Sequence, residues 1–214
     1  MCRAFGAILL VLVIMNAHAQ QPLRYLALGD SYTIGESVAE NERWPNQLAA
    51  KLSDASRSVD KPTIIATTGW RTDDLKQAID KAALSPEYDL VSLLIGVNNQ
   101  YQNKPIGQYE IEFKELLNMA IKLAKGKKEN VFVVSIPDYG FTPFGKPKQK
   151  RISRDIDAFN EANKKIAKKA GVRYFNITDL SRKGLAKPAL VATDGLHPSG
   201  KQYSLWVERI FKGF

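Results

Sequence analysis

The spacing of apolar residues along the chain switches repeatedly between the periods of a strand and of a helix. Short apolar runs predict five strands, over 24–28, 63–67, 89–95, 130–136 and 172–175. Longer amphipathic segments predict helices over 44–53, 72–82, 107–125, 152–170 and 199–213. Strands that alternate with helices are typical of one parallel sheet with helices on both faces. The pattern therefore predicts a single α/β domain with three layers.

Polar residues follow several of these predicted strands directly. Ser31 comes after the first strand, Gly69 after the second and Asn98 after the third. Asp194 and His197 come just before the last predicted helix. In open parallel sheets, sites form beyond the carboxyl ends of the strands. We therefore expect these five residues to meet at one edge of the sheet.

The residue types at this edge are those that acyl transfer needs. A serine hydroxyl such as that of Ser31 becomes a nucleophile when a base takes its proton, and His197 is the candidate base. Asp194, three residues before His197, is the carboxylate that would orient the imidazole, because this spacing in a helical turn puts both side chains on one side. The backbone N–H groups of Ser31 and Gly69 and the side-chain amide of Asn98 are candidate donors to an oxyanion.

Each of these residues also has a purely structural interpretation. Ser31 and Asn98 are common helix caps, and Gly69 is typical of a turn with positive φ. Asp194 begins a common turn, and His197 alone is an ordinary surface residue. None of these interpretations explains why all five fall at the same predicted edge.

The first 19 residues differ from the rest of the chain. Arg3 is followed by an apolar stretch over 5–15 and by Ala17-His18-Ala19, a small-x-small cleavage site. This is typical of a secretory signal peptide, and an uncleaved membrane anchor is the alternative. We expect a signal peptide over 1–19, cleavage after Ala19, a folded domain over 20–214, and a secreted or periplasmic protein.

Cleavage at that point removes Cys2, the only cysteine, and leaves His197 as the only histidine. We therefore expect no disulfide, no thiol chemistry and no zinc site, since no Cys/His cluster has ligand spacing. No phosphate-binding loop of the P-loop type is present. The sequence thus predicts a protein without metal or cofactor.

The chain is basic, with a formal net charge of +9, which becomes +8 when Arg3 is lost. The densest basic patch comprises Lys146, Lys148, Lys150, Arg151 and Arg154. Such a patch is either a solvated surface or an attraction to anionic lipid or glycan. No nucleic-acid motif is present, so no nucleic-acid partner is expected.

The Pro- and Gly-rich segment 137–150 follows the fourth predicted strand. We interpret it as an irregular loop and, as a hypothesis, as a mobile flap beside the site, with Phe141 and Phe144 lining an acyl channel. The alternative is a plain surface loop that carries scattered lysines.

Four sequence blocks carry a resemblance to a known family. They are "GDSYT" at 29–33, the glycine of "TTGWRT" at 67–72, "GVNN" at 96–99 and "DGLHPS" at 194–199. In this order they resemble the SGNH, or GDSL-type, hydrolases, which are serine esterases and lipases. The resemblance implies a flavodoxin-like α/β/α fold with a five-stranded parallel sheet.

The resemblance also implies roles for individual residues. Ser31 matches the nucleophile, and Asp194 and His197 match the rest of the triad. Ser31, Gly69 and Asn98 match the oxyanion hole. The α/β-hydrolase family fits less well, because "GDSYT" lacks the second glycine of a Gly-x-Ser-x-Gly elbow.

Two positions depart from the family pattern. Asn99 stands where the family often has aspartate, and Tyr32 stands where leucine gives the family one of its names. We expect Asn98 to act as a donor despite the change at Asn99, and Tyr32 to reshape the pocket.

Together these features predict an exported serine hydrolase that cleaves carboxylic esters through an acyl-enzyme. Its expected partner is a small-molecule, lipid or glycan ester, with peripheral contact to anionic surfaces and a monomeric state. The alternatives are a carbohydrate O-acetyl esterase of the same family and a non-catalytic glycan-binding domain on this fold. The sequence does not choose among lysophospholipids, thioesters, acetylated sugars and short-chain esters.

Overall fold

The computed structural model describes residues 21–55 and 58–214. The predicted signal peptide over 1–19 lies outside the described residues. Across the part of the chain that is described, no helix has both the length and the apolar character needed to cross a membrane.

The described chain is built around a five-stranded parallel sheet in the order β2-β1-β3-β4-β5. The strands are β1 (Tyr25–Gly29), β2 (Thr63–Ala66), β3 (Leu90–Leu94), β4 (Val131–Val134) and β5 (Arg173–Phe175). All five residues of the central strand β3 are buried. Its apolar run in the sequence is therefore explained by helices that cover both faces of the sheet.

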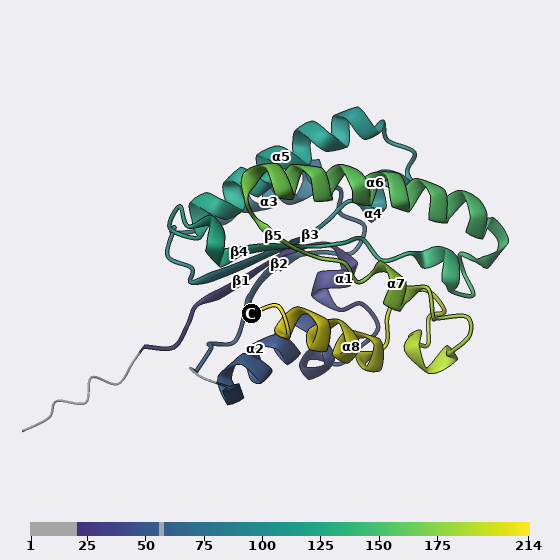
Figure 1. Cartoon of the computed structure of the whole chain (residues 1–214), viewed down its shortest axis with the longest axis horizontal. Coiled ribbons are helices and arrows are strands. Elements are labelled where there is room, and N and C mark those ends of the chain that lie inside the picture. Colours follow the sequence, from purple (N-terminus) through teal and green to yellow (C-terminus); the bar gives the residue numbers. More distant parts are fainter. Residues whose placement is uncertain (1–20, 56–57) are drawn as a thin grey trace, which may run out of the picture.

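Helices form a layer on each side of this sheet (Figure 1). One layer contains α3 (Thr72–Ala82), α5 (Ile106–Leu123) and α6 (Gln149–Ala170). The other contains α2 (Trp44–Ala55) and α8 (Gly200–Phe211). The predicted three-layer α/β fold is confirmed.

The strand order places a topological switch point between β1 and β3. From β1 the chain crosses to β2 at the sheet edge, and from β2 it returns past β1 to β3 on the other side. The chain therefore leaves β1 toward one edge of the sheet and leaves β3 toward the other edge. Connections that diverge in this way form a crevice at the carboxyl ends of β1 and β3. Ser31 follows β1 and Asn98 follows β3, so both lie at this crevice.

Three short helices were not predicted from the sequence: α1 (Ser31–Ile34), α4 (Val97–Tyr101) and α7 (Thr178–Ser181). Each has only four or five residues. An apolar period of 3.6 residues cannot be recognised over so few positions.

The structure adds detail to the irregular loop predicted over 137–150. The segment contains the 3-10 turns η3 (Tyr139–Phe141) and η4 (Lys146–Lys148), and α6 begins at Gln149. Its first part is buried, and Asp138 is fully enclosed. Asp138 accepts a hydrogen bond from Arg182 Nε at 2.9 Å, and its backbone N–H donates to Ser181 Oγ at 2.8 Å. These bonds hold the start of the segment in place. The exposed part of the segment lies further along the chain, around Phe144 and Lys146.

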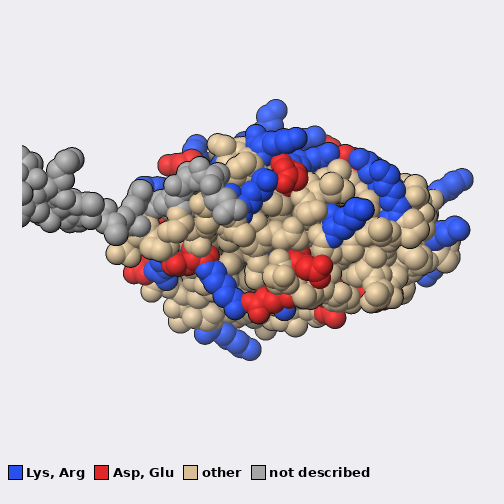
Figure 2. Space-filling view, turned by 90° about the horizontal axis from the view of Figure 1, so that it is seen from below, with Lys and Arg blue, Asp and Glu red and all other residues tan. Residues whose placement is uncertain are grey.

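Charged side chains are distributed over the surface. On the face that carries α2 and α8, lysines and arginines are scattered, with acidic side chains between them (Figure 2). This face therefore resembles an ordinary solvated surface, which was one of the two interpretations of the high net charge.

Candidate active site

Ser31 lies at the first position of α1, directly after β1. Asp30 caps this short helix, because its Oδ1 accepts the Tyr32 backbone N–H at 3.0 Å. A Cβ at Gly29 would lie 2.2 Å from Thr33 Oγ1 and 2.5 Å from the Leu94 carbonyl oxygen. Only glycine fits at that position, so the strand ends in a tight turn that presents Ser31.

Asp194 and His197 are in direct contact. His197 Nδ1 lies 2.6 Å from Asp194 Oδ2. The other carboxylate oxygen accepts the backbone N–H groups of Leu196 at 2.8 Å and His197 at 2.9 Å. The segment is an Asx-type turn with Gly195 at φ +72°, not the helical turn expected from the three-residue spacing. The turn nevertheless brings the two side chains together as predicted.

The charge of Asp194 determines the tautomer of His197. Burial of the Asp194 carboxyl acts to raise its pKa, but hydrogen bonds from Ser37 Oγ, His197 and neighbouring backbone N–H groups hold that pKa well below its ordinary value. Asp194 is therefore ionised at neutral pH and accepts a hydrogen bond from the Nδ1–H group of His197. Nε2 of His197 is left as an acceptor, which is the form that a general base requires.

Ser31 and His197 line the same pocket, whose volume is about 190 Å³. Their exposed fractions are 4% and 9%. Within the described part of the chain, neither Ser31 Oγ nor His197 Nε2 has a hydrogen-bond partner. In structures without substrate, catalytic hydrogen bonds are often long and shorten when the substrate binds.

Gly69 and Asn98 line this pocket as well. The backbone N–H of Gly69 has no acceptor among the described residues, and a Cβ built on Gly69 meets no atom within 4 Å. Asn98 Nδ2 donates one hydrogen to the Trp70 carbonyl oxygen at 2.8 Å and keeps a second for another acceptor. Because Trp70 adjoins Gly69, this bond holds the two candidate donors together. The five candidate residues thus share one small region, as the strand-end argument predicts.

Asn99 has a structural function that explains its departure from the family pattern. Its Oδ1 accepts the Thr72 backbone N–H at 3.1 Å, and its Nδ2 donates to Thr72 Oγ1 at 2.7 Å. The Thr72 hydroxyl donates its own proton to Glu112. The Asn99 amide thus pairs with both the backbone N–H and the hydroxyl oxygen of Thr72, and it connects α4 to the start of α3.

Asn99→Asp is expected to lower the free energy of unfolding by about 1–3 kcal/mol, because two carboxylates would then compete for the single hydroxyl proton of Thr72. Urea denaturation of the wild type and the variant measures the change. A variant as stable as the wild type would contradict this hydrogen-bond assignment.

Asp30, next to Ser31, is fully buried, and its Oδ2 has no hydrogen-bond partner among the described residues. Burial raises the pKa of this carboxyl to about 7, although backbone N–H groups of Tyr32, Asp30 and Gly96 act in the opposite direction. Asp30 directly follows β1 and precedes α1, so it lies at the carboxyl ends of the strands. The folded state therefore favours the protonated form of Asp30 more than the unfolded chain does.

Asp30→Asn is expected to remove one pH-dependent contribution to stability. In the unfolded chain Asp30 ionises near its ordinary pKa, whereas in the folded protein it stays protonated up to about pH 7. The unfolding free energy of the wild type minus that of the variant should therefore fall as the pH rises from about 4 to 7 and level off above. Denaturation across this range measures the difference, and a constant difference would contradict the raised pKa.

Several contacts and lining residues of the site were not predicted from the sequence. Ser37 Oγ donates to Asp194 Oδ2 at 2.7 Å across 157 positions of sequence, so no local pattern could indicate it. The Tyr32 ring lies edge-on to the His197 ring, with centroids 5.8 Å apart. Tyr101, Tyr139 and Phe144 complete the aromatic lining. Phe144 was a predicted lining residue, whereas Phe141 does not line this pocket.

A family model, the GDSL-like lipase/acylhydrolase family, matches residues 27–205. The chain belongs to this family. The GDSL-family assignment makes it a carboxylic ester hydrolase and confirms the resemblance carried by the four blocks. No curated protein matched the chain in the sequence comparison.

Solved structures share the fold of this GDSL-family chain. Axe2, an acetylxylan esterase from Geobacillus stearothermophilus, has a TM-score of 0.70 at 18% identity, covering 92% of this chain and 96% of that one. A member of the lipolytic G-D-S-L family from Veillonella parvula gives 0.67 at 17% identity, covering 90% and 98%. The esterase EstA from Pseudoalteromonas gives 0.64 at 18% identity, covering 88% and 94%. At these identities the likeness concerns the fold.

The GDSL-family chain shows no group of three or more His, Cys, Asp or Glu side chains that could hold a metal ion in its described part.

Proposed function

We propose that this GDSL-family hydrolase cleaves carboxylic esters through Ser31, His197 and Asp194. The observation that supports the proposal is the contact between the Asp194 carboxylate and Nδ1 of His197. His197 itself lines one pocket together with Ser31, Gly69 and Asn98.

In the first half-reaction Ser31 Oγ attacks the ester carbonyl carbon while His197 Nε2 takes the hydroxyl proton. Asp194 stabilises the resulting imidazolium. The carbonyl oxygen becomes an oxyanion, and the N–H groups of Ser31 and Gly69 and the amide of Asn98 donate to it. The Ser31 N–H is free for this purpose because the first N–H groups of a helix have no acceptor within the helix.

The tetrahedral intermediate then collapses. The bond to the alcohol oxygen breaks, the alcohol leaves with the proton from His197, and the acyl group stays on Ser31 Oγ. Water attacks this acyl-enzyme with His197 again as base, which releases the carboxylic acid and restores the serine hydroxyl.

The dimensions of the pocket favour a short acyl group. Its volume of about 190 Å³ is below the ~300–1,000 Å³ typical of pockets for drug-sized ligands. Hydrolysis of p-nitrophenyl esters of increasing acyl length tests this, and kcat/KM should be highest for acetate or butyrate and fall for longer chains. A steady rise toward long chains would favour a lipase-type substrate, and no turnover of any ester would overturn the proposal.

A carbohydrate O-acetyl ester is the second candidate substrate. Tyr101 and Phe144, at the pocket, expose 55% and 52% of their surface, and their ring centroids lie 6.3 Å apart. Exposed aromatic faces of this kind can pack against the apolar face of a sugar ring. The fold shared with an acetylxylan esterase is in keeping with this candidate. Release of acetate from acetylated xylan, compared with release of fatty acid from lysophospholipid, separates the two classes.

Asn98→Ala is expected to lower kcat by roughly 10²–10³-fold and to change KM little, because an oxyanion donor acts mainly in the transition state. Steady-state kinetics on p-nitrophenyl acetate measures both constants. If KM rose while kcat stayed constant, Asn98 would instead bind the ground-state substrate or only orient Trp70.

We also propose that the enzyme is exported, on the basis of the basic and apolar N-terminal residues and Ala17-His18-Ala19. Recovery of the protein from the periplasm or the medium with Gln20 at its N-terminus would support this. Recovery of the full-length chain in the membrane fraction would indicate an uncleaved anchor.

A further inference from the structure

A second pocket, of about 460 Å³, adjoins the candidate active site. It shares Tyr101, Tyr139 and Phe144 with the pocket of Ser31, so these three side chains form the wall between the two. The ring centroids of this wall lie 6.2, 6.3 and 6.4 Å apart. An ester that reacts at Ser31 and extends over the aromatic wall enters the second pocket.

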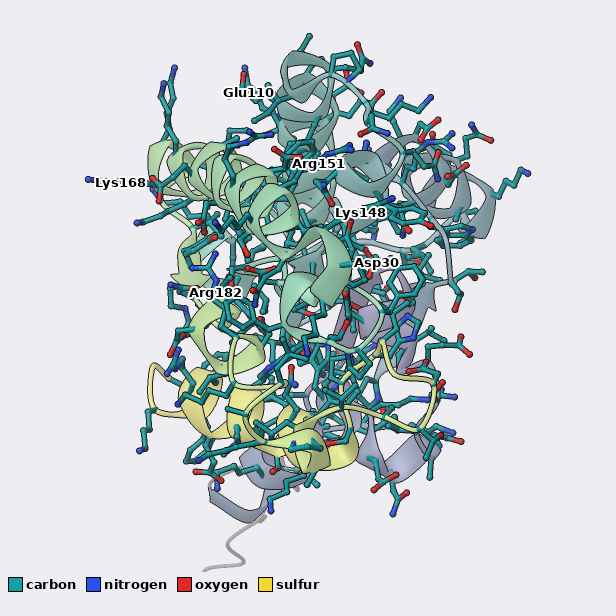
Figure 3. The ribbon with its side chains drawn as sticks, turned by 90° about the vertical axis from the view of Figure 1, so that its right-hand side faces the viewer. Asp30, Glu110, Lys148, Arg151, Lys168 and Arg182 are labelled. Atoms are coloured by element: carbon teal, nitrogen blue, oxygen red, sulfur yellow. The ribbon has the colours of Figure 1, made fainter. Side chains whose placement is uncertain are left out.

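The second pocket is lined by two cations, Lys148 and Arg151, and by no carboxylate. Lys148 forms no ion pair with any described residue. Arg151 lies 3.6 Å from Asp155, but Asp155 also pairs with Arg154 at 3.0 Å. The cations here therefore outnumber the one carboxylate that neighbours them. In the end-on view of Figure 3, Lys148 and Arg151 project close to Asp30, the residue before Ser31. The shared wall of Tyr101, Tyr139 and Phe144 places the two pockets side by side.

A buried amide adds a neutral donor to this pocket. Gln100 lines the pocket with an exposed fraction of 4%. Its Oε1 accepts the Tyr139 hydroxyl proton at 2.9 Å, which orients the side chain. Its Nε2 has no hydrogen-bond partner among the described residues. The N-terminus of the 22-residue helix α6, which follows Lys148, contributes further positive potential.

We propose that the second pocket binds a carboxylate or phosphate group carried by the ester substrate. Lys148, Arg151 and Gln100 Nε2 are the donors, and the ester carbonyl lies across the aromatic wall at Ser31. The inference rests on the proposed function, because the anionic group belongs to an ester that reacts at Ser31. Within the basic patch noted in the sequence, Lys148 and Arg151 line this pocket and are assigned to anion binding. Lys146 and Lys150 do not line the pocket and have no part in the proposal.

Three matched acetyl esters test this proposal. Para-acetoxybenzamide is neutral, para-acetoxybenzoate carries a carboxylate, and para-acetoxyphenyl phosphate carries a phosphate, each on the alcohol side. The measured quantity is kcat/KM for each anionic ester divided by kcat/KM for the neutral one. It is determined for the wild type, for Lys148→Gln/Arg151→Gln, and for the control Lys146→Gln/Lys150→Gln. Both double variants remove two charges from one exposed segment, and thermal melting checks that each folds.

The ratio should fall by about 10-fold or more in Lys148→Gln/Arg151→Gln, since charge-assisted hydrogen bonds to an anion are lost. It should change little in the control, and the fall should be smaller at high salt. A fall for only one anionic ester supports the proposal and identifies whether a carboxylate or a phosphate is bound.

An unchanged ratio in Lys148→Gln/Arg151→Gln would overturn the proposal. Equal falls of the ratio in the two double variants would also overturn it. They would indicate that the basic segment attracts anions through its overall charge and that the pocket does not bind them specifically. In either case, turnover of the neutral ester by the wild type leaves the proposed function intact. Absence of turnover of all three esters would overturn the proposed function and this inference together.

Discussion

Replacing Ser31 with alanine is expected to lower kcat by about 10⁶-fold, as the loss of a triad serine does on another fold. The reason is that the Ser31 hydroxyl is the group that carries the acyl chain in the proposed mechanism. The residual rate should come from the oxyanion donors and from substrate binding alone. Single-turnover and steady-state hydrolysis of p-nitrophenyl acetate measure the loss.

The fold should tolerate this change, because the Ser31 side chain makes no hydrogen bond to another described residue. Ser204→Ala is a matched control: Ser204 lies on α8, and its hydroxyl donates to the Lys201 carbonyl oxygen at 2.8 Å, away from the pocket. This control should keep wild-type activity. If Ser31→Ala kept more than a few per cent of the wild-type activity, a different nucleophile would have to be found.

Asp194→Asn is expected to lower kcat by about 10⁴-fold at neutral pH. The amide can still accept the backbone N–H groups of Leu196 and His197, so the turn should persist. It can also donate to His197 Nδ1, which favours the tautomer whose Nε2 carries the proton. That tautomer cannot take the proton of Ser31. Kinetics on p-nitrophenyl acetate, with KM compared, measure the effect.

Ser37→Ala is the matched comparison for this variant. It removes one hydrogen bond to Asp194 but keeps the carboxylate charge. A loss of only about 2–10-fold is expected, the range for a single ordinary hydrogen bond. Equal losses in Ser37→Ala and Asp194→Asn would contradict the view that the charge and the tautomer matter most.

Much of the fold could be predicted from the sequence because the strands are short and apolar. The run that forms β3 is buried at every residue, and a strand covered by helices on both faces has no reason to alternate. The long helices carry wide apolar stripes, which the period of 3.6 residues reveals. The edge shared by Ser31 and Asn98 then follows from the way parallel strands end together.

Other features depend on contacts that no local pattern records. The bond from Ser37 to Asp194 and the ring contact of Tyr32 with His197 join distant parts of the chain. The segment from Pro137 contains prolines and glycines typical of an irregular loop, yet Asp138 is buried because Arg182 lies where it can neutralise the carboxylate. Such pairings are set by the tertiary structure, so composition predicts the irregular backbone of this segment but not the burial of Asp138.

The most direct test of the central claim is covalent labelling of the nucleophile. The wild type is incubated with ethyl p-nitrophenyl methylphosphonate. The nucleophile attacks the phosphorus, p-nitrophenolate leaves, and an ethyl methylphosphonyl group stays bound to the nucleophile as a stable adduct. Intact-mass analysis and peptide mapping then locate the adduct. We predict one adduct, on Ser31, that forms in step with the loss of esterase activity and is absent in Ser31→Ala. Two results would contradict the assignment of Ser31 as the nucleophile. One is a loss of activity with the adduct on another residue, and the other is an enzyme that stays active although Ser31 is labelled.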